Sequence, residues 1–238
     1  MLRLLPLALA LLIASHAAAL TLLDDRRFLR AEEFTGTLGD CGTLSPSQPF
    51  QPWTASQGCL HGGVEHESTA EAGLLRGADH LETTGGGFDV DVESRYEIDF
   101  SVGADTLVRI DFDLSFSIDG EEGPGLTPET MAGLLLLRDG VEAFAYEASF
   151  TEPYPGAYRL VPPTSGVHRA TLDPGATYTF SAWLRSHRQP NALADFSYSL
   201  TEVPEPDSAP LVGLGAIGLA AWRRRRTRAR VQPARPIR

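Results

Sequence analysis

Strict alternation of apolar and polar residues is the feature that most constrains the fold of this chain. The segment 109–119 has an apolar residue at every second position, namely Ile110, Phe112, Leu114, Phe116 and Ile118. The segments 88–102, 142–150 and 195–201 follow the same rule. A period of two places these apolar side chains on one face of an extended strand, which is typical of a half-buried antiparallel sheet.

Turn residues separate these segments. Asp139-Gly140 predicts a tight hairpin between the apolar run 134–137 and the strand that follows it. The sequence Leu172-Asp173-Pro174-Gly175 predicts a turn before a strand at 176–184. Several short strands separated by such turns predict an all-β domain over residues 20–202, an antiparallel β-sandwich of the jelly-roll type. Only 68–81 shows some helical spacing, and its two glycines argue against a helix.

The N-terminus has the parts of a secretion leader. Arg3 precedes an apolar run at 4–14, and Ser15–Ala19 then supplies small residues. The best pattern for signal peptidase is Ala17-x-Ala19, so we predict a signal peptide at 1–19 and export by the secretion machinery. A first core helix is the alternative, but the small residues and the acidic pair that follows do not suit one.

Export affects the interpretation of Cys41 and Cys59, the only cysteines in the chain. In an oxidising compartment two cysteines usually pair, so we predict a structural disulfide between them. The enclosed segment contains three prolines, and we expect a loop there with little secondary structure. A disulfide that closes it would add about 3 kcal/mol to the stability.

Charge is distributed very unevenly along the chain, which has a total formal charge of −11. Residues 20–202 hold 29 of the 31 acidic residues and 11 of the 20 arginines, so this segment has a charge of −18. Such a surface repels nucleic acid and anionic lipid and attracts cations. We therefore exclude nucleic acid as a partner of the ectodomain.

The C-terminal segment 203–238 has three parts in a fixed order. The sequence Val203-Pro204-Glu205-Pro206 precedes an apolar run at 209–222, and a basic cluster at 223–230 begins with Arg223, Arg224, Arg225 and Arg226. Fourteen helical residues span about 21 Å, short of the roughly 30 Å hydrocarbon core, but interfacial and snorkelling side chains close such a gap. We predict a short transmembrane helix at 209–222 whose arginines stay cytoplasmic. The prolines favour an extended, accessible junction outside.

This order resembles the PEP-CTERM sorting signal of Gram-negative bacteria, and the resemblance covers the last 36 residues only. It implies an exosortase as partner, an integral-membrane cysteine transpeptidase that recognises Pro204-Glu205-Pro206 and releases or transfers the ectodomain. It also implies an association with extracellular polysaccharide. The chain continues to Arg238, beyond the usual end of such signals. An ordinary tail anchor with a basic end is the alternative.

Two groups of residues suggest metal ligands. The segment 61–67 contains two histidines and two glutamates that could hold zinc, but their spacing is not that of a helical zinc motif, and Gly62 and Gly63 favour a solvated loop. Acidic residues also lie on the polar faces of the predicted strands. Calcium is the alternative there, with Asp119, Glu121 and Glu122 as its ligands, against a solvated acidic surface that discourages edge-to-edge aggregation.

No catalytic residue is predicted, because the sequence lacks a Gly-x-Ser-x-Gly elbow, a phosphate loop and a dinucleotide fingerprint. Two carboxylates could cleave a glycoside, but the sequence does not select a pair. Aromatic residues could stack on sugars or pack in the core, namely Trp53, Trp183, Tyr154 and Tyr158. We expect a non-enzymatic protein without cofactor, anchored transiently in the inner membrane and then located at the cell surface, in the envelope or outside the cell. A calcium-assisted carbohydrate-binding module and a secreted glycoside-active enzyme are the alternatives.

Overall fold

Thirteen strands in two antiparallel sheets make up the part of the chain that the structure, a computed structural model, describes. This part comprises residues 20–34, 38–84, 89–118, 129–151, 165–187 and 192–203. No helix in it is long and apolar enough to cross a membrane. The predicted leader, the helix at 209–222 and the arginine cluster lie outside the described residues.

The first sheet, sheet A, has the order β10-β9-β12-β7-β2-β3, and β1 also pairs with β7. Strands β1 and β2 lie end to end along β7, because β1 pairs with residues 98–102 of β7 and β2 pairs with residues 89–95. The bounds are β1 (Leu20–Asp25), β2 (Phe28–Phe34), β3 (Leu38–Leu44), β7 (Asp89–Val102), β9 (Glu129–Arg138), β10 (Val141–Thr151) and β12 (Thr177–His187).

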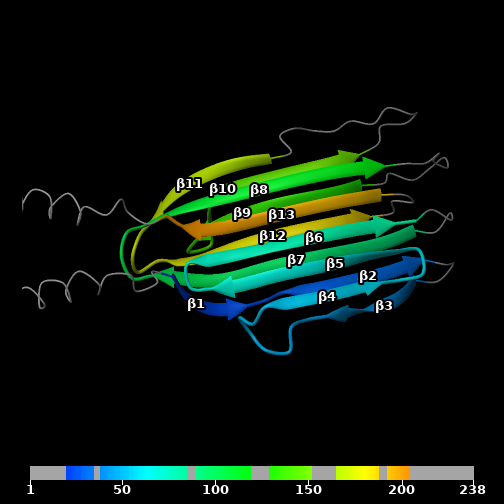
Figure 1. The fold of residues 1–238 in the computed structure, drawn as a ribbon, viewed down its shortest axis with the longest axis horizontal. Coiled ribbons are helices and arrows are strands. Elements are labelled where there is room, and N and C mark those ends of the chain that lie inside the picture. The colour runs from blue at the N-terminus through cyan, green and yellow to red at the C-terminus, as the bar shows by residue number, and fades with distance from the viewer. Residues whose placement is uncertain are drawn as a thin grey trace, which may run out of the picture. The chain divides into compact units, whose positions relative to one another are not determined.

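The second sheet, sheet B, has the order β11-β8-β13-β6-β5-β4 and packs against sheet A (Figure 1). Its bounds are β4 (Trp53–Gly58), β5 (Gly62–Glu71), β6 (Leu74–Thr83), β8 (Thr106–Ile118), β11 (Ser165–Leu172) and β13 (Ala192–Glu202). The edge strands β3 and β4 lie together at the lower side of Figure 1, and β10 and β11 lie at the upper side. The prediction of an all-β sandwich is confirmed.

The last eight strands pair as one long folded hairpin. Strand β6 pairs with β13, β7 with β12, β8 with β11 and β9 with β10. Additional pairing of β8 with β13 and of β9 with β12 divides these strands between the two sheets. The five N-terminal strands extend both sheets along one side.

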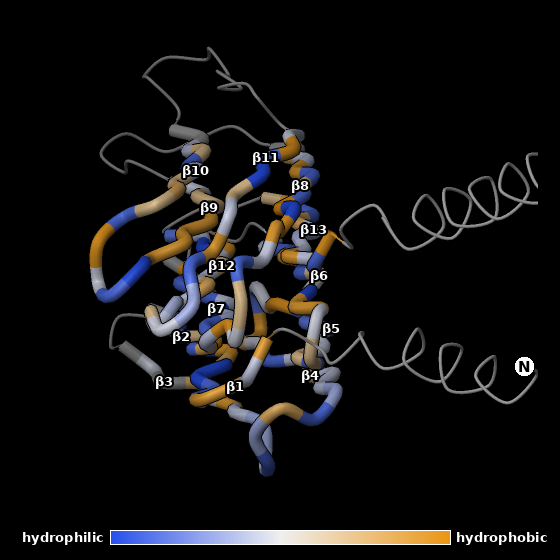
Figure 2. Tube along the Cα trace, turned by 90° about the vertical axis from the view of Figure 1, so that its left-hand side faces the viewer, coloured by the Kyte–Doolittle hydropathy of each residue, from blue (hydrophilic) through white to orange (hydrophobic). Residues whose placement is uncertain are grey.

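Alternation along the strands builds the core, and Figure 2 shows hydrophobic and hydrophilic residues alternating along them. The side chains of Ile110, Phe112 and Leu114 are at most 9% exposed, as their spacing predicts. Tyr96 and Tyr198 meet at the centre of the core with ring centroids 5.4 Å apart. The sandwich is therefore held by apolar and aromatic side chains from the inner face of each sheet.

Turns with positive φ confirm two of the sequence predictions. Asp139 and Gly140 have φ values of 50° and 80°, so both central residues of the β9–β10 hairpin lie in the left-handed region, as in a type I′ turn. The turn before β12 contains Gly175 at a φ of 83°. Glycine suits these positions because it has no Cβ to clash with the backbone.

Two local expectations were wrong, whereas the glycine argument against a helix at 68–81 was right. Residues 68–81 form parts of β5 and β6 and the turn between them, with Gly73 at a φ of 86°. The Tyr198 ring lies against Gly77 and leaves no room for a side chain at this position. The segment 61–67 is mostly strand, and the segment between the cysteines contains the end of β3 and all of β4. Strand pairing with neighbours far along the chain outweighs these local glycine and proline signals.

Both ends of the described chain lie at one end of the sandwich. Leu20, the first residue of β1, is 2% exposed and pairs with Val102. At the end of β13, the Val203 amide donates to the carbonyl oxygen of Leu107, only five residues beyond Val102. The predicted sorting motif therefore begins where a central strand of sheet B ends.

Candidate functional site: a groove on the outer face of sheet B

A shallow groove of about 550 Å³ crosses the outer face of sheet B, and a second hollow of about 330 Å³ continues it. The two share the side chains of Glu67, Ala78, Asp113 and Ser197. These residues come from four adjacent strands, β5, β6, β13 and β8. The groove is therefore a property of the paired sheet and not of one loop.

Strand register places the shared residues in one row. Glu67 pairs with Ala78, Ala78 with Ser197, and Ser197 with Asp113. All four are exposed. Since neighbouring strands are about 4.8 Å apart, the two acidic residues stand roughly 14 Å apart along the row, measured between Cα atoms. The row thus presents a carboxylate, a methyl group, a hydroxyl group and a second carboxylate.

Two further rows flank this one. On one side, Arg76 pairs with Ser199, which pairs with Asp111. On the other side, Glu65, His80, Asp195 and Ser115 follow one another across the same four strands. Small residues occupy β6 and β13 at the centre, and longer side chains stand on β5 and β8. That difference in side-chain length explains why the centre is hollow.

The groove is predominantly acidic. Its outward carboxylates are Glu65, Glu67, Asp111, Asp113 and Asp195, and the outward basic side chains among its described lining residues are Arg76 and His80. Asp111 accepts two hydrogen bonds from Arg109, and Asp195 accepts one from Ser115 and meets His80 Nδ1 at 2.7 Å. Within the described part of the chain, no hydrogen bond or ion pair engages Glu67 or Asp113. These two carboxylates are therefore free to accept hydrogen bonds from a ligand.

The groove offers no exposed aromatic ring among its described lining residues. Phe112 and Tyr198 contribute only covered rings, 9% and 3% exposed. Trp53 packs on His66 inside the sandwich, with ring centroids 4.9 Å apart. Trp183 lies against Gly133 in sheet A, and Tyr154 and Tyr158 lie outside the described residues. A ligand would bind here through polar contacts and not through stacking.

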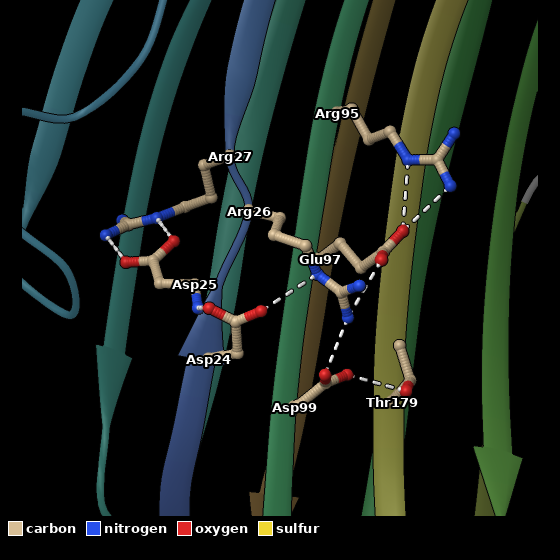
Figure 3. Close-up of polar contacts among 8 residues, drawn as sticks. All are labelled: Asp24, Asp25, Arg26, Arg27, Arg95, Glu97, Asp99 and Thr179. Atoms are coloured by element: carbon tan, nitrogen blue, oxygen red, sulfur yellow. Dashed lines mark hydrogen bonds and ion pairs between the residues drawn. The ribbon is translucent and has the colours of Figure 1, made fainter. Parts of the chain in front are cut away.

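A buried polar network lies on the inner side of the same strands. The side chains of Arg27 and Asp25 are fully buried, and their two charged groups meet through two hydrogen bonds of 2.7 and 2.5 Å. Arg27 also donates to the Ser68 hydroxyl and to the carbonyl oxygen of Gln51, each at 2.9 Å. The preceding residue, Arg26, instead reaches exposed or half-buried acids, as Figure 3 shows.

His66 extends the network from Ser68 to Asp79. Its Nε2 lies 2.6 Å from Ser68 Oγ and its Nδ1 lies 2.6 Å from Asp79 Oδ1, which also accepts a hydrogen bond from Ser94. Ser68 thus links the Arg27 guanidinium to the His66 ring, and His66 links Ser68 to the Asp79 carboxylate.

Ser68, His66 and Asp79 have the hydrogen-bond pattern of a serine-hydrolase triad, but they lie in the interior, where their role is structural. Ser68 and His66 are each 2% exposed and Asp79 is 4% exposed. Burial raises the pKa of Tyr198 well above its ordinary value, and the nearby charge of Asp79 raises it further. Arg27 lies on β2's N-terminal side and Ser68 on β5, so the network ties sheet A to sheet B through polar groups. Sequence patterns gave no sign of it except polar residues at inward positions.

The structure brings some predicted site residues together and leaves others undescribed. Cys41 and Cys59 form the predicted disulfide, with Cα atoms 5.5 Å apart. His61 Nδ1 meets Glu33 Oε1 at 2.7 Å, whereas His66 is buried and was wrongly placed in a solvated loop. The proposed calcium ligands Asp119, Glu121 and Glu122 lie outside the described residues, as do Pro204-Glu205-Pro206 and Arg223–Arg226.

Comparison with known families identifies a motif in the C-terminal tail. The PEP-CTERM protein-sorting motif matches residues 202–226. This is a PEP-CTERM domain-containing protein. The match begins at the last residue of β13, so the motif follows directly on the folded domain. A PEP-CTERM motif indicates an exported, membrane-transiting protein with an exosortase as its processing partner.

No curated protein matches the chain. Among solved structures, the active domain of bacteriophage CBA120 tailspike protein 4 is 10% identical with a TM-score of 0.27, and the match covers 60% of this chain and 20% of that one. TmCBM61, solved with β-1,4-galactotriose, is 6% identical with a TM-score of 0.25, covering 59% and 88%. The adhesin domain of Epf from Streptococcus pyogenes is 11% identical with a TM-score of 0.25, covering 78% and 66%. Likeness this low assigns neither a fold family nor a function.

Proposed function

We propose that this PEP-CTERM protein is a non-enzymatic surface protein whose ectodomain binds extracellular polysaccharide through the groove on sheet B. The leader at 1–19 would direct export, and the helix at 209–222 would hold the protein in the inner membrane. An exosortase would then act at Val203–Pro206 and place the ectodomain in the envelope or outside the cell. The nested pairing of β6–β13 supports the jelly-roll class for this ectodomain.

The observation that carries the binding proposal is the central row of the groove. Carboxylates accept hydrogen bonds from sugar hydroxyl groups, and such charge-assisted bonds are the strong ones. Glu67 and Asp113 provide two acceptors on either side of Ser197, which both donates and accepts. An extended glycan lying across the strands would meet all three.

The charge of the groove selects the kind of polysaccharide. Five outward carboxylates repel uronate, sulfate or phosphate groups. A neutral glycan displaces only the water that hydrates the carboxylates, and its hydroxyl groups then donate hydrogen bonds to them in place of that water. We therefore expect neutral polysaccharides to bind and anionic ones to be excluded at low ionic strength.

The test is a binding assay of the mature protein against neutral and anionic glycans. We expect a double variant, Glu67→Gln with Asp113→Asn, to lose at least about tenfold in affinity, since a hydrogen bond to a charged group is worth about 1.5–3 kcal/mol. The matched control, Glu142→Gln with Glu147→Gln, removes two exposed carboxylates from β10 at the same change in net charge. Equal affinity of the groove variant and the wild-type protein would contradict the proposal, as would release of reducing sugar by the wild-type protein.

Processing of the tail is tested separately. We expect Pro204→Ala with Pro206→Ala to leave the protein unprocessed in the inner membrane, because the extended proline backbone is what the sorting enzyme is expected to recognise. A matched substitution beyond the motif, Ser208→Ala, should be processed normally. Normal cleavage of the double-proline variant, seen by mass spectrometry of the C-terminus, would contradict the role given to the motif.

A further inference from the structure

The disulfide lies in a cluster of potential metal ligands at the edge of the sandwich where β3 of sheet A lies beside β4 of sheet B. The Glu33 carboxylate and the sulfur atoms of Cys41 and Cys59 all lie within 4.8 Å of one another. They come from β2, from β3 and from the residue after β4. Three elements thus direct potential ligands to one point.

His61 supplies a fourth group. Its Nδ1 lies 2.7 Å from Glu33 Oε1, and its backbone amide donates to Glu33 Oε2 at 3.3 Å. These contacts hold the carboxylate, which is 6% exposed, in its charged form, so the pKa of Glu33 lies below its ordinary value. The backbone of His61 is also fixed, since its carbonyl oxygen accepts from the Thr84 amide at 2.7 Å.

We propose that reduction of the disulfide converts this cluster into a zinc site with Cys41, Cys59, Glu33 and His61 as its four ligands. Two thiolates, an imidazole and a carboxylate are ligands that zinc accepts in tetrahedral geometry. Zinc bonds of about 2.0–2.3 Å place the ligand atoms of a tetrahedral site roughly 3.3–3.8 Å apart. Glu33, Cys41 and Cys59 already have ligand atoms within 4.8 Å of one another, and His61 Nδ1 lies 2.7 Å from Glu33 Oε1, so the histidine ring would have to move toward the two sulfur atoms.

The chemical step is a thiol–disulfide exchange followed by metal binding. A dithiol, such as the active site of a thiol–disulfide oxidoreductase, gives two electrons and two protons to the bond between Cys41 and Cys59 and becomes a disulfide itself. Zinc then replaces the two thiol protons, which pass to solvent. Glu33 would bind through a carboxylate oxygen and His61 through a ring nitrogen.

The site lies between the edges of the two sheets, and this position determines what zinc binding would do. In the oxidised protein the disulfide links the edge of sheet A, through β3, to the segment that follows the edge strand of sheet B. Gln57 Nε2 also donates to the carbonyl oxygen of Cys41 at this edge, and His61 contacts Glu33. Zinc in the reduced protein would replace the covalent link, so the edge would stay closed in either redox state.

The experiment measures zinc affinity of the full ectodomain-bearing protein by competition with a chromophoric chelator, before and after treatment with a dithiol. We expect one equivalent of zinc to bind to the reduced protein at least about 100-fold more tightly than to the oxidised protein. The variants Glu33→Gln and His61→Ala should each weaken binding at least about tenfold. Matched controls are Glu32→Gln, on the neighbouring residue, and His168→Ala, on β11 at the opposite edge of sheet B.

Three results would overturn the proposal. The first is that the reduced protein binds zinc no more tightly than the oxidised protein or a Cys41→Ser, Cys59→Ser variant. The second is that the Glu33 and His61 variants bind zinc as the wild type does, which would show that the thiols of an unfolded chain bind the metal. The third is that zinc does not raise the melting temperature of the reduced protein, followed by circular dichroism.

Discussion

Two adjacent arginines allow a direct test of how the N-terminal strands are attached. Arg27 and its partner Asp25 have fully buried side chains, whereas the side chain of Arg26 is 48% exposed (Figure 3). Substitution of Arg27 by alanine leaves a buried carboxylate without its cation and removes the donors to Ser68 and Gln51. Breaking a buried ion pair from one side costs about 3–5 kcal/mol.

The matched substitution, Arg26→Ala, removes three ion pairs that are open to solvent. Exposed pairs contribute only about 0–1 kcal/mol each, and their shared cation makes the sum smaller still. For a domain of this size, 1 kcal/mol shifts the melting temperature by about 2–4 °C. We therefore expect a loss of about 6–20 °C for Arg27→Ala and a few degrees for Arg26→Ala.

Thermal and urea unfolding of the mature protein measure both variants. A double variant, Asp25→Ala with Arg27→Ala, separates the lost ion pair from the uncompensated charge, because it leaves no buried carboxylate. Its destabilisation should fall short of the sum of the two single variants by about 0.5–3 kcal/mol. Equal melting temperatures for Arg27→Ala and Arg26→Ala would refute the assignment of Arg27 to a fully desolvated network.

Four further outcomes follow from the core tyrosines, the disulfide and the loops. Tyr198→Phe should be neutral or stabilising and Tyr96→Phe should cost about 1 kcal/mol, because within the described residues the Tyr198 hydroxyl makes no hydrogen bond and that of Tyr96 donates to the Thr69 carbonyl oxygen at 3.1 Å. Burial raises the pKa of both phenols, so the neutral forms stabilise the fold below pH 10 and stability is lost as the pH rises above it; an absorbance titration that ionises all tyrosines near 10 without unfolding would contradict this. Cys41→Ser with Cys59→Ser should lower the free energy of unfolding by about 3 kcal/mol in metal-free buffer, measured by urea unfolding, and an unchanged midpoint would oppose it. Added calcium should raise the melting temperature only if the alternative calcium site exists, so on the proposed function we expect no shift in calorimetry.

Sequence patterns predicted the fold class and most of the later strands, because a period of two is a local signal. The segments 88–102, 109–119, 142–150 and 195–201 lie almost entirely within strands. The β9–β10 hairpin was predicted for the same reason, since its turn geometry depends on two adjacent residues. The disulfide could be predicted from the expected oxidising compartment and from the presence of only two cysteines in the chain.

The errors occur where the outcome depends on distant partners. Gly77 argued correctly against a helix, but the sequence could not show that it leaves room for Tyr198, 121 positions later in the chain. His66 looked solvated because glycines and glutamates surround it in sequence, but strand alternation turns it inward, where Asp79 and Ser68 meet its two ring nitrogens. Neither contact can be foreseen without the register of β5, β6 and β13.

The groove was missed for the same reason, and this explains how the fold prepares a surface. Ala78 and Ser197 are unremarkable in sequence, and they mark a site only because register places them between Glu67 and Asp113. The inward neighbours of these residues, Asp79 and Tyr198, belong to the polar and aromatic interior. Because alternate residues of one strand serve the core and the surface, a slip of one position would bury the acids and expose the core. Within the polar network, His66 on β5 meets Asp79, which stands opposite it on β6 next to the groove pair Glu67 and Ala78, so this contact favours the register on which the groove depends.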